Sequence, residues 1–164
     1  MRYSFVNEND EDNTHFFQTQ LGIYYAVKFR PSSYMLGEDK IYSQNVFEFI
    51  IELVFNPLAR KPSLDKLVSS TIAAIIENFY QKKDKSVCIY ICDSSDGKQD
   101  IRRKKFDEWF YNQNYIGLMK FDEIIVDSKN NRFPLSLIIK NDNPYFIEII
   151  TDFASLAQIN SKLS

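Results

Sequence analysis

The alternation of apolar and polar residues along the chain first predicts a strand over Val46–Phe55, VFEFIIELVF. One face of this strand carries only apolar side chains, at Phe47, Phe49, Ile51, Leu53 and Phe55. The other face is mixed, with Val46, Glu48, Ile50, Glu52 and Val54. We therefore expect the first face to lie on the core and the second to be partly covered or to form an amphipathic surface.

Further strands are predicted wherever β-branched and aromatic residues cluster between turn residues. These segments are Arg2–Val6, His15–Thr19, Leu21–Arg30, Ser86–Cys92, Leu118–Asp127 and Arg132–Lys140. The segment Ser86–Cys92 is apolar on both faces, which predicts an interior strand. The last two segments flank the turn-rich Ser128–Asn131, which predicts a hairpin.

Three helices are predicted over residues 64–81, 98–112 and 144–160, where apolar residues recur at spacings of three and four. Ser63 suits the N-cap of the first helix, whose regular stripe predicts a core helix. Asn143 suits the cap of the third, with Pro144 at its first position. Because the strands come in runs, we expect a single α+β domain over residues 1–164. Its sheet is mixed and mainly antiparallel, with about five to seven strands and the three helices packed on it.

Composition and charge narrow the classes of function. The chain has 164 residues, 45% of them hydrophobic and 26% charged, which is typical of a folded globular protein. Its net charge of −2 gives no overall attraction to nucleic acid, so such binding needs a local basic patch. Residues 1–12 are polar and acidic, unlike a signal peptide, and no apolar run is long enough to span a bilayer. We therefore expect a soluble cytoplasmic protein that makes no use of a membrane.

The cysteine and histidine content argues against several kinds of site. Cys88 and Cys92 lie four residues apart in one predicted strand, about 13 Å from each other, which is too far for a disulfide. They share a strand face and are predicted to be core residues. His15 is the only histidine, which argues against a zinc site and against most nucleophile–histidine–acid arrangements. We predict no metal and no cofactor.

The best candidate site lies where the interior strand leads into the second helix. Residues 93–97 read DSSDG, and the helix then carries cations in its first turns. A helix N-terminus exposes unpaired N–H groups and a partial positive charge, so an anion can bind there. The candidate anion-binding residues are Ser94, Ser95, Arg102 and Arg103, and the loop acids are Asp93 and Asp96. The alternative is ordinary helix capping, and the two loop acids would themselves repel an anion.

A helical wheel singles out Arg102 among these cations. The apolar stripe of Phe106, Trp109 and Phe110 centres close to Arg102, while Arg103 falls on its flank. An arginine in line with a buried stripe must be paired or reach a cleft, so Arg102 either locks the loop through Asp93 or Asp96 or contributes to a site. The remaining charged residues of this segment are predicted to form a solvated face: Lys104, Lys105, Asp107 and Glu108.

Two other chemistries use the same region. Asp93, Asp96 and Asp100, completed by Glu48, Glu52 or Glu123, would hold a divalent metal in a nuclease or phosphodiesterase. The segment does not contain a recognised metal motif. A basic patch over residues 102–105 with exposed tyrosines would instead bind RNA. The tyrosines considered are Tyr24, Tyr25 and Tyr111.

Several blocks of the sequence resemble an uncharacterised family of short bacterial proteins. They are SSYMLG, VFEFIIELVFNP, TIAAIIENFY, ICDSSDGKQDIRRKKFDEWF and SLIIKNDNPYF, of which the CDSSDG block is the most distinctive. The resemblance covers nearly the whole chain. It implies a bacterial, stand-alone protein of one domain, and it assigns no catalytic residue.

Taken together, these patterns predict a small binding or interaction module of regulatory type. A protein partner or a second copy of the chain would occupy an aromatic, half-covered strand face. The alternative is a nucleic-acid-directed protein, either an RNA binder or a metal-dependent nuclease, that uses residues 93–103. The sequence leaves open whether the protein is an enzyme.

Overall fold

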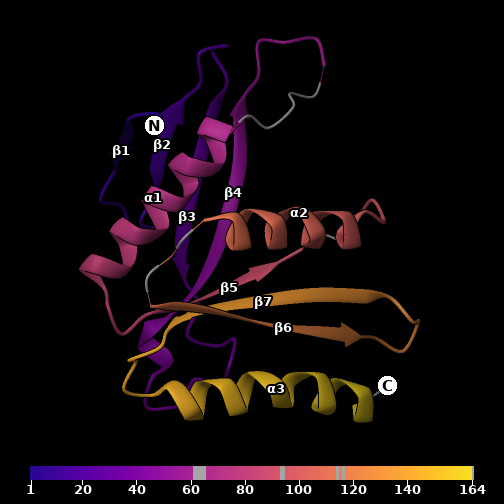
Figure 1. The fold of residues 1–164 in the computed structure, drawn as a ribbon. Coiled ribbons are helices and arrows are strands. Elements are labelled where there is room, and N and C mark those ends of the chain that lie inside the picture. The colour runs from indigo at the N-terminus through magenta and orange to yellow at the C-terminus, as the bar shows by residue number, and fades with distance from the viewer. Residues whose placement is uncertain (61–65, 93–94, 114, 116, 164) are drawn as a thin grey trace.

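A computed structural model describes residues 1–60, 66–92, 95–113, 115 and 117–163, with side chains described as far as residue 157. Its elements follow one another as shown in Figure 1. In chain order they are β1 (Phe5–Asn7), β2 (His15–Gln18), β3 (Tyr24–Pro31), the 3-10 helix η1 (Ser43–Asn45), β4 (Val46–Phe55), α1 (Lys66–Lys82), β5 (Val87–Ile91), α2 (Gln99–Asn112), β6 (Leu118–Val126), β7 (Arg132–Lys140) and α3 (Phe146–Leu163).

The strands form one seven-stranded sheet in the order β1-β2-β3-β4-β5-β7-β6. Neighbouring strands run antiparallel except β4 and β5, which run parallel and are joined through the crossover helix α1. β6 and β7 pair along their whole length, as the predicted hairpin requires. The α+β class with a mixed, mainly antiparallel sheet is therefore confirmed.

The strongest apolar patterns located their strands well. β4 and β7 have the predicted bounds, and β5 lies between β4 and β7, so the prediction of an interior strand is confirmed. β3 begins three residues later than predicted, because the residues before it form a turn. In that turn the amide of Gly22 donates to the carbonyl of Thr19 at 3.0 Å, and the Thr19 amide donates to the Ile23 carbonyl at 2.9 Å.

One face of the sheet is covered by α1 and α2 (Figure 1). Their side chains pack with those of β3, β4 and β5 into one core cluster that includes Phe29, Phe49, Phe79 and Phe106. The rings of Phe29 and Phe79 stack with their centroids 3.9 Å apart. The predicted role of the first helix as a core helix is confirmed.

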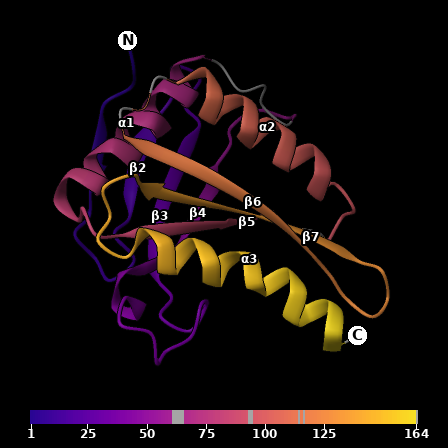
Figure 2. The ribbon, with the colours of Figure 1, turned by 60° about the horizontal axis from the view of Figure 1, so that its bottom comes forward.

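On the opposite face, α3 covers only the part of the sheet that β5, β7 and β6 form (Figure 2). Ile149 and Phe153 of α3 pack into a second cluster with β5 and β7, which also takes in Leu36 and Tyr42 from the segment before β4. The sheet twists strongly, so β1–β4 run at a steep angle to β5, β7 and β6 (Figure 1). The outer face of β1–β4 consequently has no helix on it among the described residues.

The helix starts differ in part from the prediction. Ser63, the predicted cap of the first helix, lies outside the described residues. α3 begins at Phe146, two residues later than predicted, because Asn143 organises a turn before the helix. The Asn143 side chain accepts a hydrogen bond from the Tyr145 amide at 2.8 Å, and its carbonyl accepts one from the Phe146 amide at 3.1 Å.

Both cysteines and the histidine are interior residues. Cys88 and Cys92 are each 1% exposed and unbonded to one another, which confirms their prediction as core residues. His15 is 1% exposed and lies between the rings of Phe5 and Phe29, and its Nδ1 donates to the Asn13 carbonyl at 2.9 Å. Burial lowers the pKa of His15. Among the described residues, no helix is long and apolar enough to cross a membrane.

Candidate functional site

The loop before α2 turns sharply at Gly97, whose φ of 72° is a conformation that glycine adopts freely. Asp96 accepts a hydrogen bond from the Lys98 amide at 3.1 Å, and Lys98 is the N-cap residue of α2, without a side-chain cap bond of its own. Asp96 therefore fixes the turn just ahead of the helix, and the N-cap position itself is taken by Lys98. Two of the predicted site residues, Asp93 and Ser94, lie outside the described residues.

Arg102 is held by Asp96 in a two-bond ion pair. Its two terminal nitrogens lie 2.7 and 2.6 Å from the two carboxylate oxygens of Asp96. Hydrogen bonding from Arg102 holds the pKa of Asp96 well below its usual range. This is the loop-locking pair that the sequence left open as one alternative. Its side chains keep 29% and 42% of their surface exposed, and the anion-binding role of Arg102 stays a prediction.

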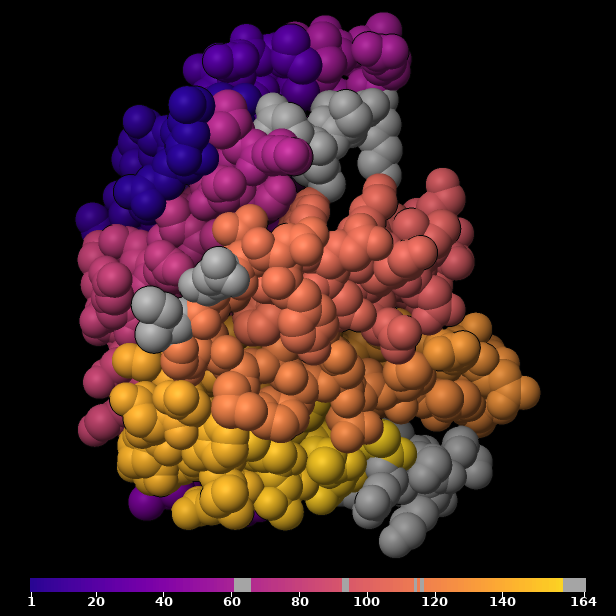
Figure 3. All heavy atoms as spheres, viewed as in Figure 1, coloured from indigo at the N-terminus to yellow at the C-terminus, as the bar shows by residue number. Residues whose placement is uncertain are grey.

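α2 directs toward the sheet the apolar side chains that the helical wheel indicated and one further side chain, that of Asp107. Phe106 and Phe110 are buried as expected, and Lys104, Lys105 and Glu108 are exposed as expected. The prediction for Asp107 is wrong, however, because its carboxylate forms an ion pair with the buried ammonium of Lys120 on β6. In the space-filling view α2 lies directly against the β6–β7 hairpin (Figure 3).

Lys120 is the centre of a polar cluster beneath α2. Its side chain is 0% exposed, and its ammonium lies between Asp107 and Asp122, 2.6 Å from the latter. The Ser136 hydroxyl donates to Asp122 at 2.7 Å. Beside this cluster, the Nε of Arg103 is buried without a hydrogen-bond partner among the described residues, while the residue as a whole is partly exposed, as a position on the flank of the apolar stripe requires.

The protonation states of Lys120 and the nearby Cys92 favour a structural role for this cluster over a catalytic one. Burial favours the neutral amine, but hydrogen bonds with Asp107 and Asp122 raise the pKa of Lys120 above its usual value. Burial raises the pKa of the neighbouring Cys92 thiol to about 11. At neutral pH the ammonium is thus not a base and the thiol is not a nucleophile. An inward-pointing charge on an edge strand such as β6 also protects that edge from pairing with another strand.

Asp93 of the proposed metal site lies outside the described residues, and the glutamates proposed to complete the site are not brought to its loop. Glu48 and Glu52 lie on the face of β4 opposite α1 and α2, and Glu123 lies on the face of β6 opposite Lys120. An Asp100 carboxylate oxygen lies 3.8 Å from a terminal nitrogen of Arg132, so Asp100 forms an ion pair on the surface. Within the described part of the chain, no group of three or more His, Cys, Asp or Glu side chains is placed to hold a metal ion.

The tyrosines proposed to assist an RNA patch are also dispersed. Tyr25 is buried in the core beneath α1, and Tyr24 points to the opposite face of the sheet. Only Tyr111, which is 66% exposed, lies on α2 near the cationic residues, and the Lys120 ammonium lies 5.4 Å from its ring centre.

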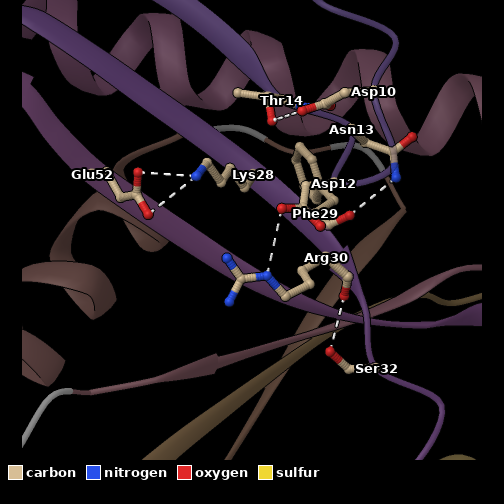
Figure 4. Close-up of polar contacts among 9 residues, drawn as sticks. All are labelled: Asp10, Asp12, Asn13, Thr14, Lys28, Phe29, Arg30, Ser32 and Glu52. Carbon is tan, nitrogen blue, oxygen red and sulfur yellow. Dashed lines mark hydrogen bonds and ion pairs between the residues drawn. The ribbon is translucent and has the colours of Figure 1, made fainter.

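The outer face of β1–β4, which we call the open face, is a second candidate surface. By strand register its members are Val6, Phe16, Tyr24, Ala26, Lys28, Arg30, Glu48, Ile50, Glu52 and Phe55. Lys28 contacts both carboxylate oxygens of Glu52, at 3.1 and 3.3 Å, and the Nε of Arg30 lies 3.6 Å from Asp12 (Figure 4). The mixed face predicted for β4 is thus present and carries an ordered charge pattern.

The loop between β1 and β2 borders this open face. The Phe29 amide donates to the Asp12 carbonyl at 2.8 Å, and the Asn13 side chain donates to the Phe29 carbonyl at 3.0 Å (Figure 4). The Thr14 amide and hydroxyl both donate to Asp10 at 2.7 Å. The bonds to Phe29 continue the pairing along β3 past His15, the first residue of β2, and place Asp12 beside Arg30.

Large apolar side chains gather where β3 begins and β4 ends. This group, which we call the hairpin-end patch, consists of Leu21, Tyr24, Leu53, Val54 and Phe55, each between 40% and 62% exposed. Tyr24 pairs with Phe55 and Tyr25 with Leu53, so Val54 is an extra, bulged residue that turns Phe55 onto the open face beside Tyr24. The alternation in the sequence did not predict this, because a bulge reverses the faces of the residues that follow it.

Comparison with known proteins places the chain in a family. A family of unknown function, DUF6169, has a model that matches residues 64–155, so the chain belongs to that family. The matched segment runs from α1 to α3 and includes α2 and the polar cluster around Lys120. Neither the curated proteins nor the solved structures gave a match.

Proposed function

We propose that the protein is a binding module that docks another protein chain on its open face and hairpin-end patch. The observation that carries this proposal is the patch itself, in which five large apolar side chains are 40% to 62% exposed at one end of the sheet. Single exposed apolar residues are ordinary, whereas grouped ones mark interaction surfaces. We also propose that the chain forms a single domain, that the protein is bacterial and cytoplasmic, and that its role is regulatory.

The charge of the open face suits a protein better than a nucleic acid. Lys28 and Arg30 on β3 are balanced by Glu48 and Glu52 on the adjacent β4. Nucleic-acid binding depends on an excess of cations that neutralises phosphates, and this face has none. A balanced charge pattern around apolar side chains instead resembles the polar surround of a protein–protein interface.

Site-specific photo-crosslinking in living cells tests this proposal. A photoreactive residue replaces Phe55 in one variant and, as a matched control, Ile147, which is 73% exposed on α3. We expect a discrete protein adduct from position 55 that is absent from position 147 and is reduced when Val54→Lys is added. Equal adducts from both positions, or none from position 55 in a folded protein, would refute the proposal.

The alternative, a nucleic-acid-directed protein, rests on the cationic first turns of α2. Arg102 is engaged with Asp96, and the Nε of Arg103 is buried. The favoured function therefore remains protein binding, and the alternative remains a prediction that phosphate binding by the Arg102→Ala variant tests.

A further inference from the structure

Opposite charges occupy two neighbouring strands of the open face. β3 contributes the cations Lys28 and Arg30, and β4 contributes the anions Glu48 and Glu52. In the register of the two strands Arg30 lies opposite Glu48, and no ion pair joins them among the described contacts. The face is thus divided lengthwise into a cationic strand and an anionic strand.

A surface divided in this way is complementary to itself under one particular two-fold rotation. If two copies stack face to face about an axis parallel to the strands and midway between β3 and β4, β3 of each copy lies over β4 of the other. Residues opposite each other in the register then face each other across the interface. Arg30 would meet Glu48 of the second copy, and Tyr24 would meet its Phe55. An axis across the strands would instead place β3 of one copy over β3 of the other, cationic strand against cationic strand.

We infer that the occupant of the open face is a second copy of this chain, packed sheet on sheet about that axis. This inference rests on the proposed function, because it requires the open face to be a docking surface. Arg30 is suited to the contact because its side chain is 44% exposed and its shortest contact with Asp12 is made by Nε, at 3.6 Å. Its terminal nitrogens point away from Asp12 (Figure 4), where a carboxylate of the other copy can reach them. The four aromatic rings at the Tyr24–Phe55 end would form the apolar part of the interface.

The size of the face sets the strength of the dimer. The eight residues of β3 span about 26 Å, and four strands about 4.8 Å apart span about 19 Å, so the face covers at most about 500 Å². Standard interfaces bury about 800 Å² on each partner. We therefore expect a weak dimer that forms as the protein concentration rises.

A charge-swap experiment tests the pairing directly. Arg30→Glu and Glu48→Arg are prepared separately, and sedimentation velocity is recorded for each alone and for an equal mixture. Each single variant would bring like charges together twice in a dimer, so we expect its self-association to weaken by at least about tenfold. In the mixture every contact again joins an arginine to a glutamate, so dimers should reappear. Circular dichroism melting checks that each variant is folded.

A matched control uses an exposed pair on another surface. Asp100 and Arg132 lie 3.8 Å apart with side chains 54% and 49% exposed, and the variants Asp100→Arg and Arg132→Glu should dimerise like the wild type, alone or mixed. The inference would be overturned by a wild type that stays monomeric at every concentration, by folded single variants that dimerise normally, or by a mixture that stays monomeric. If a different protein is crosslinked from position 55, the proposed function stands and the second copy is refuted.

Discussion

Replacing Lys120 by methionine should destabilise the protein strongly, because it leaves two carboxylates without their shared counter-charge. Removing one member of a buried ion pair costs about 3–5 kcal/mol when the remaining charge is fully enclosed. Here Asp107 and Asp122 keep 27% and 37% of their side-chain surface exposed, so water can partly solvate them. We therefore expect a loss of about 2–3 kcal/mol in the free energy of unfolding.

Urea denaturation followed by tryptophan fluorescence measures this loss, because Trp109 is the only tryptophan and lies on α2. Lys104→Met, an exposed change on the same helix, serves as the control and should shift the free energy by less than about 0.5 kcal/mol. Combining Lys120→Met with Asp107→Leu and Asp122→Asn removes the stranded charges and should recover most of the loss. A cost for Lys120→Met below about 0.5 kcal/mol would refute the role assigned to this cluster.

Three further predictions concern separate parts of the fold. Because burial lowers the pKa of His15, the unfolded chain binds the proton more tightly, so the free energy of unfolding should fall as the pH decreases below about 6.5. In denaturation curves measured between pH 7 and pH 5, the His15→Leu variant should lose this pH dependence. An unchanged dependence in the variant would contradict the prediction. Tyr80→Phe removes the hydroxyl that donates to the Ile138 carbonyl at 2.6 Å and should cost about 1 kcal/mol in urea denaturation, whereas Tyr111→Phe on the surface should cost nothing measurable. Arg102→Ala should lower Tm slightly, and by less in high salt, because the ion pair of Arg102 with Asp96 lies at the surface. A large loss of phosphate binding in titration calorimetry, with Tm unchanged, would instead favour the anion site.

The sequence predicted the fold best where one periodicity persisted through a whole element. β4 and β7 were located to the residue, and the apolar stripe of α1 identified a core helix. Element ends were less accurate where side chains bond to the local backbone. The Thr19 hydroxyl accepts a hydrogen bond from the Ile23 amide at 3.3 Å, and the Asn143 side chain accepts one from the Tyr145 amide. Each bond closes a turn that delays the next element by two or three residues, and propensity alone does not reveal such bonds.

The side-chain contacts around α2 were less predictable from the sequence, because they join residues of distant segments. The helical wheel for α2 follows the stripe of Phe106, Trp109 and Phe110, and therefore assigns Asp107 to solvent. In the structure Trp109 is only partly buried. The reason Asp107 faces inward is Lys120, thirteen positions further along the chain on an edge strand, and a single-helix analysis cannot include it. The hairpin-end patch was missed for a similar reason, since the bulge at Val54 appears only in the register of two strands.

If a second copy of the chain docks on the open face, hydroxyl-radical footprinting will detect it as protection that increases with protein concentration. Oxidation of Tyr24 and Phe55 is measured by mass spectrometry as the protein concentration increases, with Tyr111, which is 66% exposed on α2, as the internal reference. We predict that Tyr24 and Phe55 become protected while Tyr111 reacts at a constant rate. Protection of Tyr111 with continued oxidation of Tyr24 and Phe55 would show that the copies associate through α2 and not through the open face.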